Sequence, residues 1–233
     1  MSTKPKNEPN TADFSHVTEW VFDLDNTLYP HEVNLFSQID KNMTAYVAEL
    51  LQLSRTRRGR CRSVITMSMA PRFRGLMIHY GIDPNAFLER AHAIDYSALL
   101  PNPELGEAIK ALPGRKFILT NGSVPHAQSR RWRTGHSRPF RGHLRYRRCR
   151  LSAQARQRDL REIRSPCQAR YDQGCDVEDL PRNLTAPKAL GMKTVLLVPR
   201  NLEGIVMERW EIPDVTDEHI DFITDDLTSF SWA

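Results

Sequence analysis

Two acidic residues, one position apart, are the first candidates for chemistry in this sequence. Asp23 and Asp25 come directly after the apolar run Trp20-Val21-Phe22 and before a turn-forming Asn26-Thr27. Alternate residues of a β-strand lie on one face, so both carboxylates should point the same way at the end of a strand. Carboxylates that close repel each other, and a divalent cation between them relieves the repulsion. The pattern therefore favours a cation site, although Asp-X-Asp alone is also common in ordinary strand-end turns.

Two further polar groups lie beside predicted elements. Lys116–Leu119 is typical of a buried strand, and Thr120-Asn121-Gly122-Ser123 follows it. At a strand tip, a hydroxyl and the neighbouring amides can hold a phosphate oxygen, but this sequence alone is also typical of a turn. Glu178-Asp179 precede a predicted helix that reaches Gly191. Because acids are favoured at helix N-termini, the pair alone does not distinguish a ligand set from a helix start.

The elements that would position these groups are mostly helical between Asp25 and Thr120. Apolar residues recur at three- and four-residue spacing over 33–53, which predicts an amphipathic helix. Helices are also predicted over 84–94 and 104–112. The apolar runs 193–198 and 222–224 predict strands, and 225–230 a closing helix. The helical stretch is too long for a simple crossover between two strands.

Composition limits the class of protein. The chain has 233 residues, 40% of them hydrophobic, and four Trp, which is enough for one large domain or a core with a smaller cap. No apolar stretch approaches the roughly 20 residues of a membrane span, so no membrane partner is expected. Residues 1–18 are polar and lack the apolar core of a signal peptide, which predicts a loose tail on a cytoplasmic protein. Four Cys without CxxC spacing indicate neither a zinc site nor a disulfide framework.

The positive charge is unevenly distributed. The net charge is +5 and the pI about 9.2, values that would suit a polyanionic partner. Of 26 Arg, however, seven lie within 55–74 and fourteen within 130–170, while all seven Lys lie outside both stretches. Both stretches also lack helical or strand periodicity. Ordinary basic surfaces mix Lys with Arg, so these two stretches need a separate explanation.

Taken together, the polar groups resemble the motifs of one enzyme superfamily. The run Asp23-Leu24-Asp25-Asn26-Thr27-Leu28-Tyr29-Pro30 resembles the first motif of the haloacid dehalogenase-like (HAD) hydrolases. Thr120-Asn121-Gly122 resembles the second motif, and Glu178-Asp179 the fourth. The resemblance covers about 19–54, 75–127 and 177–230. It implies an α/β fold, a doubly wound, Rossmann-like parallel sheet with an inserted α-helical cap. It also implies a core at 19–32 and 100–233 and a cap at 33–99.

The resemblance implies a Mg²⁺-dependent phosphatase that acts on a small-molecule phosphate ester. Asp23 would be the nucleophile and form an aspartyl-phosphate, and Asp25 the general acid and base. Mg²⁺ would be held by Asp23, the Asp25 carbonyl and Asp179, with Glu178 close by. Thr120, with the amides of Asn121 and Gly122, would bind the phosphate oxygens. The second Asp favours phosphate transfer over dehalogenation, because dehalogenases of this group lack that acid.

Three segments resemble one branch, the pyrimidine 5′-nucleotidases. They are Asn26–Pro30, Pro181-Arg182-Asn183-Leu184 and Ala186-Pro187-Lys188-Ala189-Leu190-Gly191. A nucleoside 5′-monophosphate is therefore the expected substrate. Oligomeric state is not indicated by any pattern in the sequence.

We interpret the two Arg-rich stretches, about 55–73 and 128–175, as frame-shifted translation. Ser63–Pro71, back-translated and moved by one base, can read ERYYHEYGT, which resembles a cap helix of the nucleotidase branch. Arg150–Ala155 can likewise read DYLPKP, and LPKP carries the third HAD motif, a Lys that neutralises the nucleophile and the phosphate. Asp159–Ile163 can read TYEKF. A genuine Arg-rich insertion is the alternative.

Two other functions follow if the stretches are genuine. The third-motif Lys is absent as written, and Lys188 is expected on a solvated face rather than as its substitute, so the protein could be a catalytically impaired HAD-like protein. Alternatively, the Arg clusters could bind nucleic acid. This second function is disfavoured because the clusters lack the interleaved aromatic residues of a base-stacking surface, apart from Trp132, Phe140 and Tyr146.

Sequencing the gene across both stretches tests the frame-shift hypothesis. We expect single-base changes that restore LPKP and the cap-helix sequence. An uninterrupted frame confirmed at both places would contradict it.

Overall fold

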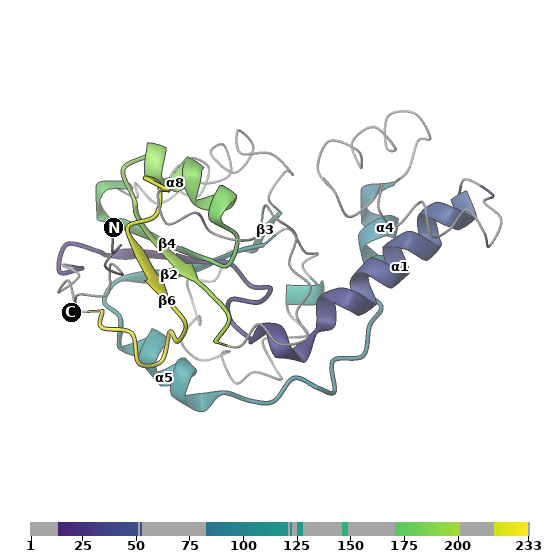
Figure 1. Ribbon diagram of the computed structural model, residues 1–233, viewed down its shortest axis with the longest axis horizontal. Helices are drawn as coiled ribbons and strands as arrows, with labels where there is room; N and C mark the ends of the chain where they lie inside the picture. The colour runs from purple at the N-terminus through teal and green to yellow at the C-terminus, as the bar shows by residue number, and fades with distance from the viewer. Residues whose placement is uncertain are drawn as a thin grey trace, which may run out of the picture.

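A parallel sheet of six strands forms the centre of the described part of the protein (Figure 1). The computed structural model describes residues 14–50, 52, 83–120, 122, 125–127, 146–148, 171–200 and 217–232. The strands, with order β3-β2-β1-β4-β5-β6, are β1 Glu19–Phe22, β2 Arg115–Thr120, β3 Tyr146–Arg148, β4 Gly174–Glu178, β5 Lys193–Leu197 and β6 Phe222–Thr224.

Strand β1 lies at the middle of the sheet. Its last residue, Phe22, pairs with Ile118 of β2 on one side and with Val177 of β4 on the other. The N–H of Asp23 still donates to the carbonyl of Val177 at 2.9 Å, so the pairing reaches the first acid. Because every strand is parallel, all carboxyl ends meet at one edge of the sheet. The strand order reverses direction at β1, and α/β sheets bind ligands at such points.

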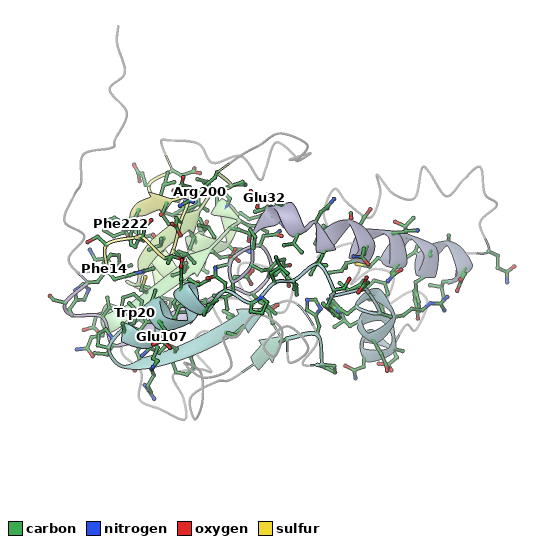
Figure 2. The ribbon with its side chains drawn as sticks, turned by 90° about the horizontal axis from the view of Figure 1, so that it is seen from below. Phe14, Trp20, Glu32, Glu107, Arg200 and Phe222 are labelled. Atoms are coloured by element: carbon green, nitrogen blue, oxygen red, sulfur yellow. The ribbon has the colours of Figure 1, made fainter. Side chains whose placement is uncertain are left out.

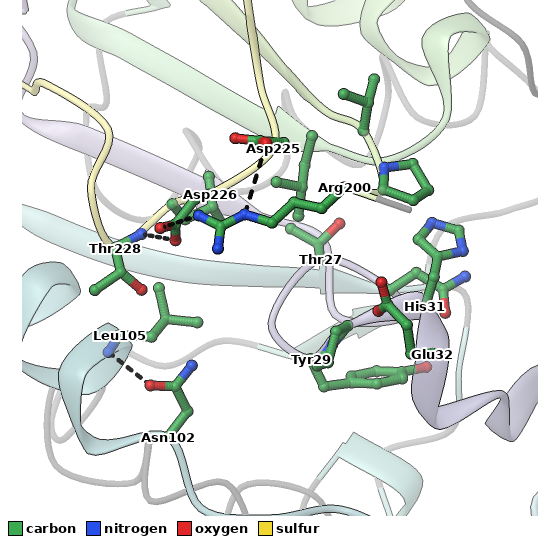
Figure 3. Close-up of a pocket in the computed structure, with 16 residues that line it drawn as sticks. Thr27, Tyr29, His31, Glu32, Asn102, Leu105, Arg200, Asp225, Asp226 and Thr228 are labelled. Carbon is green, nitrogen blue, oxygen red and sulfur yellow. Dashed lines mark hydrogen bonds and ion pairs between the residues drawn. The ribbon is translucent and has the colours of Figure 1, made fainter. Parts of the chain in front are cut away.

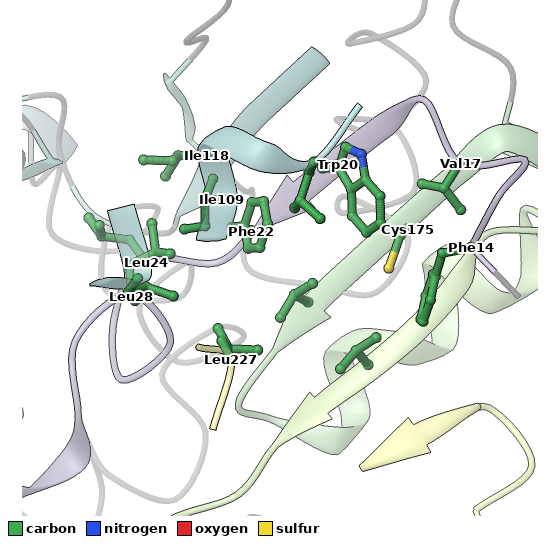
Figure 4. Close-up of a cluster of buried hydrophobic side chains, with 14 of the residues drawn as sticks. Phe14, Val17, Trp20, Phe22, Leu24, Leu28, Ile109, Ile118, Cys175 and Leu227 are labelled. Carbon is green, nitrogen blue, oxygen red and sulfur yellow. The ribbon is translucent and has the colours of Figure 1, made fainter. Parts of the chain in front are cut away.

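The two faces of the sheet are covered by different elements. Trp20, Phe22 and Ile118 point into one core (Figure 4). Val21 and its neighbours on β2 point into another. This alternation is expected of strands that are buried on both faces. Helix α5, Pro103–Ala111, covers the first face through Leu105 and Ile109. On the second face, the residues that follow α8, Thr185–Ala189, provide the cover, namely Leu190 and Met192.

A helical insert leaves the sheet between β1 and β2. The 3₁₀ turn η1, His31–Val33, leads into α1, Leu35–Leu50, and α4, Pro84–Ala91, packs against α1. Ile39, Met43 and Val47 of α1 lie four residues apart and are buried against Phe87 and Ala91 of α4. Figures 1 and 2 both show α1 extending away from the sheet. The helices predicted for these segments are confirmed.

Two sequence predictions are wrong, and three elements were not predicted. The loose tail was predicted through residue 18, but Phe14 and Val17 are buried, at 1% and 0% exposure, because they cover apolar side chains of the first core. Residues 225–230 form turns instead of the predicted helix, since the Asp226 carboxylate accepts the N–H of Thr228 at 2.8 Å. Strand β4, the turn η2 before it (Tyr171–Gln173) and the turn η3 after it (Pro181–Leu184) were not predicted.

Some predictions lie outside the described residues. These are the tail at 1–13, the whole first Arg-rich stretch and most of the second. No helix in the described part of the chain combines the length and apolar character needed to cross a bilayer.

The close approach between β1 and the turn before β2 yields a stability prediction. A Cβ on Gly114 would lie 2.0 Å from the carbonyl oxygen of Thr18, which itself accepts the N–H of Arg115 at 2.8 Å. Gly114 also has φ +74°. Gly191 has a similar φ of +86° but open space around its Cβ, so it is a matched control.

We expect Gly191→Ala to lower the free energy of unfolding by about 1–2 kcal/mol, the cost of a left-handed L-residue. Gly114→Ala should lower it by about 3 kcal/mol or more, because the backbone must also move. Urea unfolding of both variants measures the difference. Equal losses would contradict the close approach.

Candidate active site

Three carboxylates meet at the carboxyl edge of the sheet. Asp23 follows β1, Glu178 ends β4 and Asp179 follows it. One oxygen of each lies within 4.8 Å of the others, and all three residues are buried. The adjacent register of β1 and β4 produces this meeting, because Phe22 and Val177 are paired immediately before the acids. An all-oxygen, acidic donor set of this size fits a hard divalent cation such as Mg²⁺.

Glu178 also accepts hydrogen bonds from the segment that follows it. Its Oε2 accepts the N–H groups of Asp179 and Leu180 at 2.8 and 2.9 Å, and its Oε1 accepts the side-chain amide of Asn183. These donors fix the turn that begins η3 and offset part of the charge of the carboxylate. Asp23 and Asp179 are therefore the better placed of the three to contact a cation directly.

Asp179 shows the electrostatic strain of the cluster. Burial, followed by the nearby Glu178 and Asp23, raises the pKa of the Asp179 carboxyl well above its ordinary value. Asn26, in a left-handed conformation with φ 58°, donates its amide to Asp179 at 3.3 Å. His31 Nε2 lies 3.4 Å from the same oxygen. Burial lowers the pKa of His31, which favours the neutral form of the ring beside Asp179.

Asp25 lies in different surroundings, among hydrogen-bond donors. The Tyr29 hydroxyl donates to its Oδ1 at 2.8 Å, and Nε2 of His126 lies 3.0 Å from the same oxygen. The Thr120 hydroxyl donates to Oδ2 at 3.3 Å. The side chain of Asp25 is 24% exposed, so it is held in place but still reached by solvent. The two acids of one motif thus have distinct environments, as is typical of neighbouring carboxylates with different chemical roles.

The predicted phosphate-binding loop follows β2. Thr120 is buried, and its hydroxyl accepts the N–H of Gly122 at 3.0 Å while it donates to Asp25. A Cβ on Gly122 would lie 2.6 Å from Cδ2 of His126, so only glycine fits beside that ring. Asn121 lies outside the described residues. The structure thus brings Thr120 and Gly122 to the same edge as Asp23 and Asp25.

Sequence reasoning missed several contacts at this site. Tyr29 and Asn26 belong to the first motif, and their spacing from Asp25 contained a signal that could have identified them. His31 follows the same motif, next to Pro30. His126 is a single histidine after the Thr120 loop, and no pattern in the sequence distinguishes it from a structural core histidine.

A cavity of about 200 Å³ is lined in part by residues of the first motif (Figure 3). Thr27, Tyr29 and Glu32 line one side, and Arg200 lines the other. Arg200 contacts Asp226 at 2.5 Å and Asp225 at 3.6 Å, so its guanidinium is paired with two carboxylates. Since Asp23 and Asp179 do not line this cavity, we do not assign it to the phosphate group.

The structure also locates the lysine closest in sequence to the fourth motif. Lys188 of α8 forms an ion pair with Asp221, next to the start of β6. Asp221 in turn accepts the N–H of Thr194 at 3.0 Å, so the pair joins α8 to β5. Lys188 was expected on a solvated face, but it is only partly exposed, because its ammonium group is paired with Asp221.

Comparisons with known proteins identify the fold. No protein-family model matches the chain, and no curated protein matches it by sequence. The structure is similar to CbbY from Rhodobacter sphaeroides in complex with phosphate, with a TM-score of 0.54 and 16% identity over 91% of this chain and 96% of that one. It is similar to a HAD phosphatase from Thermococcus onnurineus, with a TM-score of 0.53 and 16% identity over 91% and 94%.

A third similar structure is the L-2-haloacid dehalogenase from Xanthobacter autotrophicus with chloropropionic acid covalently bound. Its TM-score is 0.51, with 12% identity over 91% of this chain and 96% of that one. At these identities the likeness establishes the fold alone. The predicted fold class, an α/β doubly wound parallel sheet with a helical insert, is confirmed.

The raised pKa of Asp179 gives a prediction about stability. Because the folded-state pKa lies above the unfolded one, its stabilising effect is complete in acid and is lost as the pH rises through the folded value. At pH 7.5 without Mg²⁺, Asp179→Asn should therefore raise Tm by about 2–4 °C, the shift that about 1 kcal/mol produces in a chain of this size. The gain should shrink at pH 4.

Mg²⁺ should raise the Tm of the wild type at pH 7.5, because binding to the folded state stabilises it. Asp179→Asn should respond much less, whereas Glu107→Gln, an exposed control on α5, should respond like the wild type. Differential scanning fluorimetry with and without MgCl₂ measures both. An Asp179→Asn response equal to that of the wild type would contradict a cation site at these carboxylates.

Proposed function

We propose that this protein is a Mg²⁺-dependent phosphohydrolase that acts on a small phosphate ester through an aspartyl-phosphate. The main support is the separation of two acids of one motif into two environments at the switch point of the sheet. Asp23 lies in the carboxylate cluster, and Asp25 lies among three donors. The fold similarity to a HAD phosphatase is consistent with this activity.

Asp23 is the proposed nucleophile. An oxygen of its carboxylate forms a bond to phosphorus while the ester P–O bond breaks, and Asp25 gives its proton to the leaving oxygen. In the second step water attacks phosphorus, its proton passes to Asp25, and the bond to Asp23 breaks to release phosphate. Asp25 therefore needs access to both the leaving group and water, in agreement with its partial exposure.

Mg²⁺ fits the carboxylate cluster by the chemistry of its donors. Asp23, Asp179 and the main-chain carbonyl of Asp25 would hold it, with Glu178 beside them. When bound, the cation would neutralise charge on the transferring phosphoryl group. Thr120 and the N–H groups of Asn121 and Gly122 would bind the phosphate oxygens, once the Gly122 N–H leaves the Thr120 hydroxyl.

The proposed substrate is a pyrimidine nucleoside 5′-monophosphate, from the resemblance of the three segments named above. The helical insert at 33–99 would act as the cap that selects the nucleoside. The Arg-rich stretches interrupt that cap and the third motif, and we retain a frame shift as their explanation.

The position of Lys188 supports a second candidate function. Since Lys188 forms an ion pair with Asp221, it would not replace the positive charge of the third-motif Lys. The chain as written would then be a catalytically impaired HAD-like protein with an intact cation site.

Hydrolysis of p-nitrophenyl phosphate with MgCl₂ separates the two functions. We expect turnover that falls about 10³-fold or more in Asp23→Asn, because the nucleophile is lost. Glu107→Gln should match the wild type. Mg²⁺-dependent stabilisation without Asp23-dependent turnover would support the impaired protein, and repair of LPKP by a base change should then restore activity.

A further inference from the structure

The side chain of His126 is buried between the proposed acid–base residue and the helical insert. It is 1% exposed, and its Nε2 lies 3.0 Å from Oδ1 of Asp25. On the other side of the ring, Nδ1 lies 2.8 Å from the hydroxyl of Tyr96. Tyr96 belongs to the segment between α4 and α5, where the chain returns from the insert to the sheet. One imidazole thus connects the sheet edge to the end of the insert.

The hydrogen bonds around this ring define its protonation pattern. The Tyr96 hydroxyl has one proton, and the carbonyl of His92, at 3.0 Å, can only accept it. Tyr96 therefore donates to His92 and accepts from Nδ1–H of His126. This leaves Nε2 directed at Oδ1 of Asp25. The ring of His92 lies against that of His126, with centroids 4.0 Å apart, and holds its plane.

The loop after β2 is shaped around the same ring. Gly122 lies against it so closely that a Cβ would approach Cδ2 of His126 to 2.6 Å. Gly122 and Asp25 both lie against the ring and cannot move independently, because the Thr120 hydroxyl binds both. The contacts thus fix the direction of His126 as well as its position.

We propose that His126 is a positioning residue for Asp25, anchored through Tyr96 to the end of the helical insert. This inference rests on the proposed function of Asp25 as general acid. Tyr29 and His126 hold Oδ1 of Asp25, so Oδ2, which the Thr120 hydroxyl also contacts at 3.3 Å, is the oxygen that faces a leaving group. A general acid must lie within hydrogen-bond distance of the oxygen that it protonates, and a misplacement of about 1 Å can reduce the rate about 10²-fold.

Two substrates with different leaving groups test this role. Nitrophenolate leaves without protonation, whereas the alkoxide of uridine 5′-monophosphate needs a proton from Asp25. His126→Leu should lower kcat/KM for uridine 5′-monophosphate about 10²-fold. It should lower kcat/KM for p-nitrophenyl phosphate by less than about 10-fold. Tyr96→Phe should show the same preference with a smaller loss. His126→Gln, which keeps a donor near Asp25, should recover part of the activity.

Tyr46→Phe is the matched control, because it removes a hydroxyl from α1, where the ring packs against Phe87. It should leave both kcat/KM values unchanged. If kcat/KM of the His126 variants falls by the same factor for both substrates, His126 has only a structural role. The inference is then wrong, while the proposed function stands.

Nitrogen-15 NMR of the histidine rings tests the link independently of turnover. His126 should show a protonated Nδ1, and its ring signals should shift in Asp25→Asn and in Tyr96→Phe but not in Tyr46→Phe. A wild type that shows no Asp23-dependent hydrolysis would overturn the proposed function. An unprotonated Nδ1, or His126 ring signals that stay unchanged in Asp25→Asn, would overturn the positioning of Asp25 by His126.

Discussion

Repulsion among three buried carboxylates is the constraint on which the rest of the site depends. Parallel pairing of β1 with β4 forces Asp23, Glu178 and Asp179 together, because the acids follow residues that are already in register. Backbone N–H groups at the start of η3 offset the charge of Glu178. The remaining imbalance appears at Asp179, whose pKa is raised. The core beneath the strands must therefore be rigid enough to hold like charges that a divalent cation would bring into balance.

Asp25, the second acid of the first motif, lies outside this repulsive cluster because the chain turns there. Asn26 adopts a left-handed conformation directly after Asp25, and its amide reaches Asp179 while Asp25 itself binds Tyr29 and Thr120. Two residues that share a strand face by spacing thus enter different electrostatic environments. One environment favours a bound cation, and the other favours a carboxyl group that exchanges a proton. This difference, more than the presence of the acids, supports the proposed phosphoryl chemistry at this edge.

The sequence predicted the parts of the fold in which a local pattern and a tertiary role agree. The period of α1 and the apolar run of β2 were sufficient. Asp23 and Thr120 were found from strand ends, and Asp179 from its place before a predicted helix. Strand β4 escaped notice because Asp176 and Glu178 interrupt its apolar residues, although both are buried. Phe14 and Val17 were assigned to a tail because a short polar segment gives no period. His126 depends on contacts about 30 and 100 residues away, which no local pattern reports.

The aromatic cluster at the opposite edge has a consequence for protein engineering. Phe14 packs against Trp20, Phe222 and Trp232, with ring centroids 5.8, 5.1 and 5.6 Å away, and Figure 2 shows Phe14 beside Phe222. The segments at 14–17 and 230–232 therefore meet far from the carboxylates, next to the amino ends of the strands. A short peptide joining them would close the chain there, and new termini could be opened elsewhere. Circular permutation would then vary the connection of the helical insert while the edge with the three carboxylates stays intact.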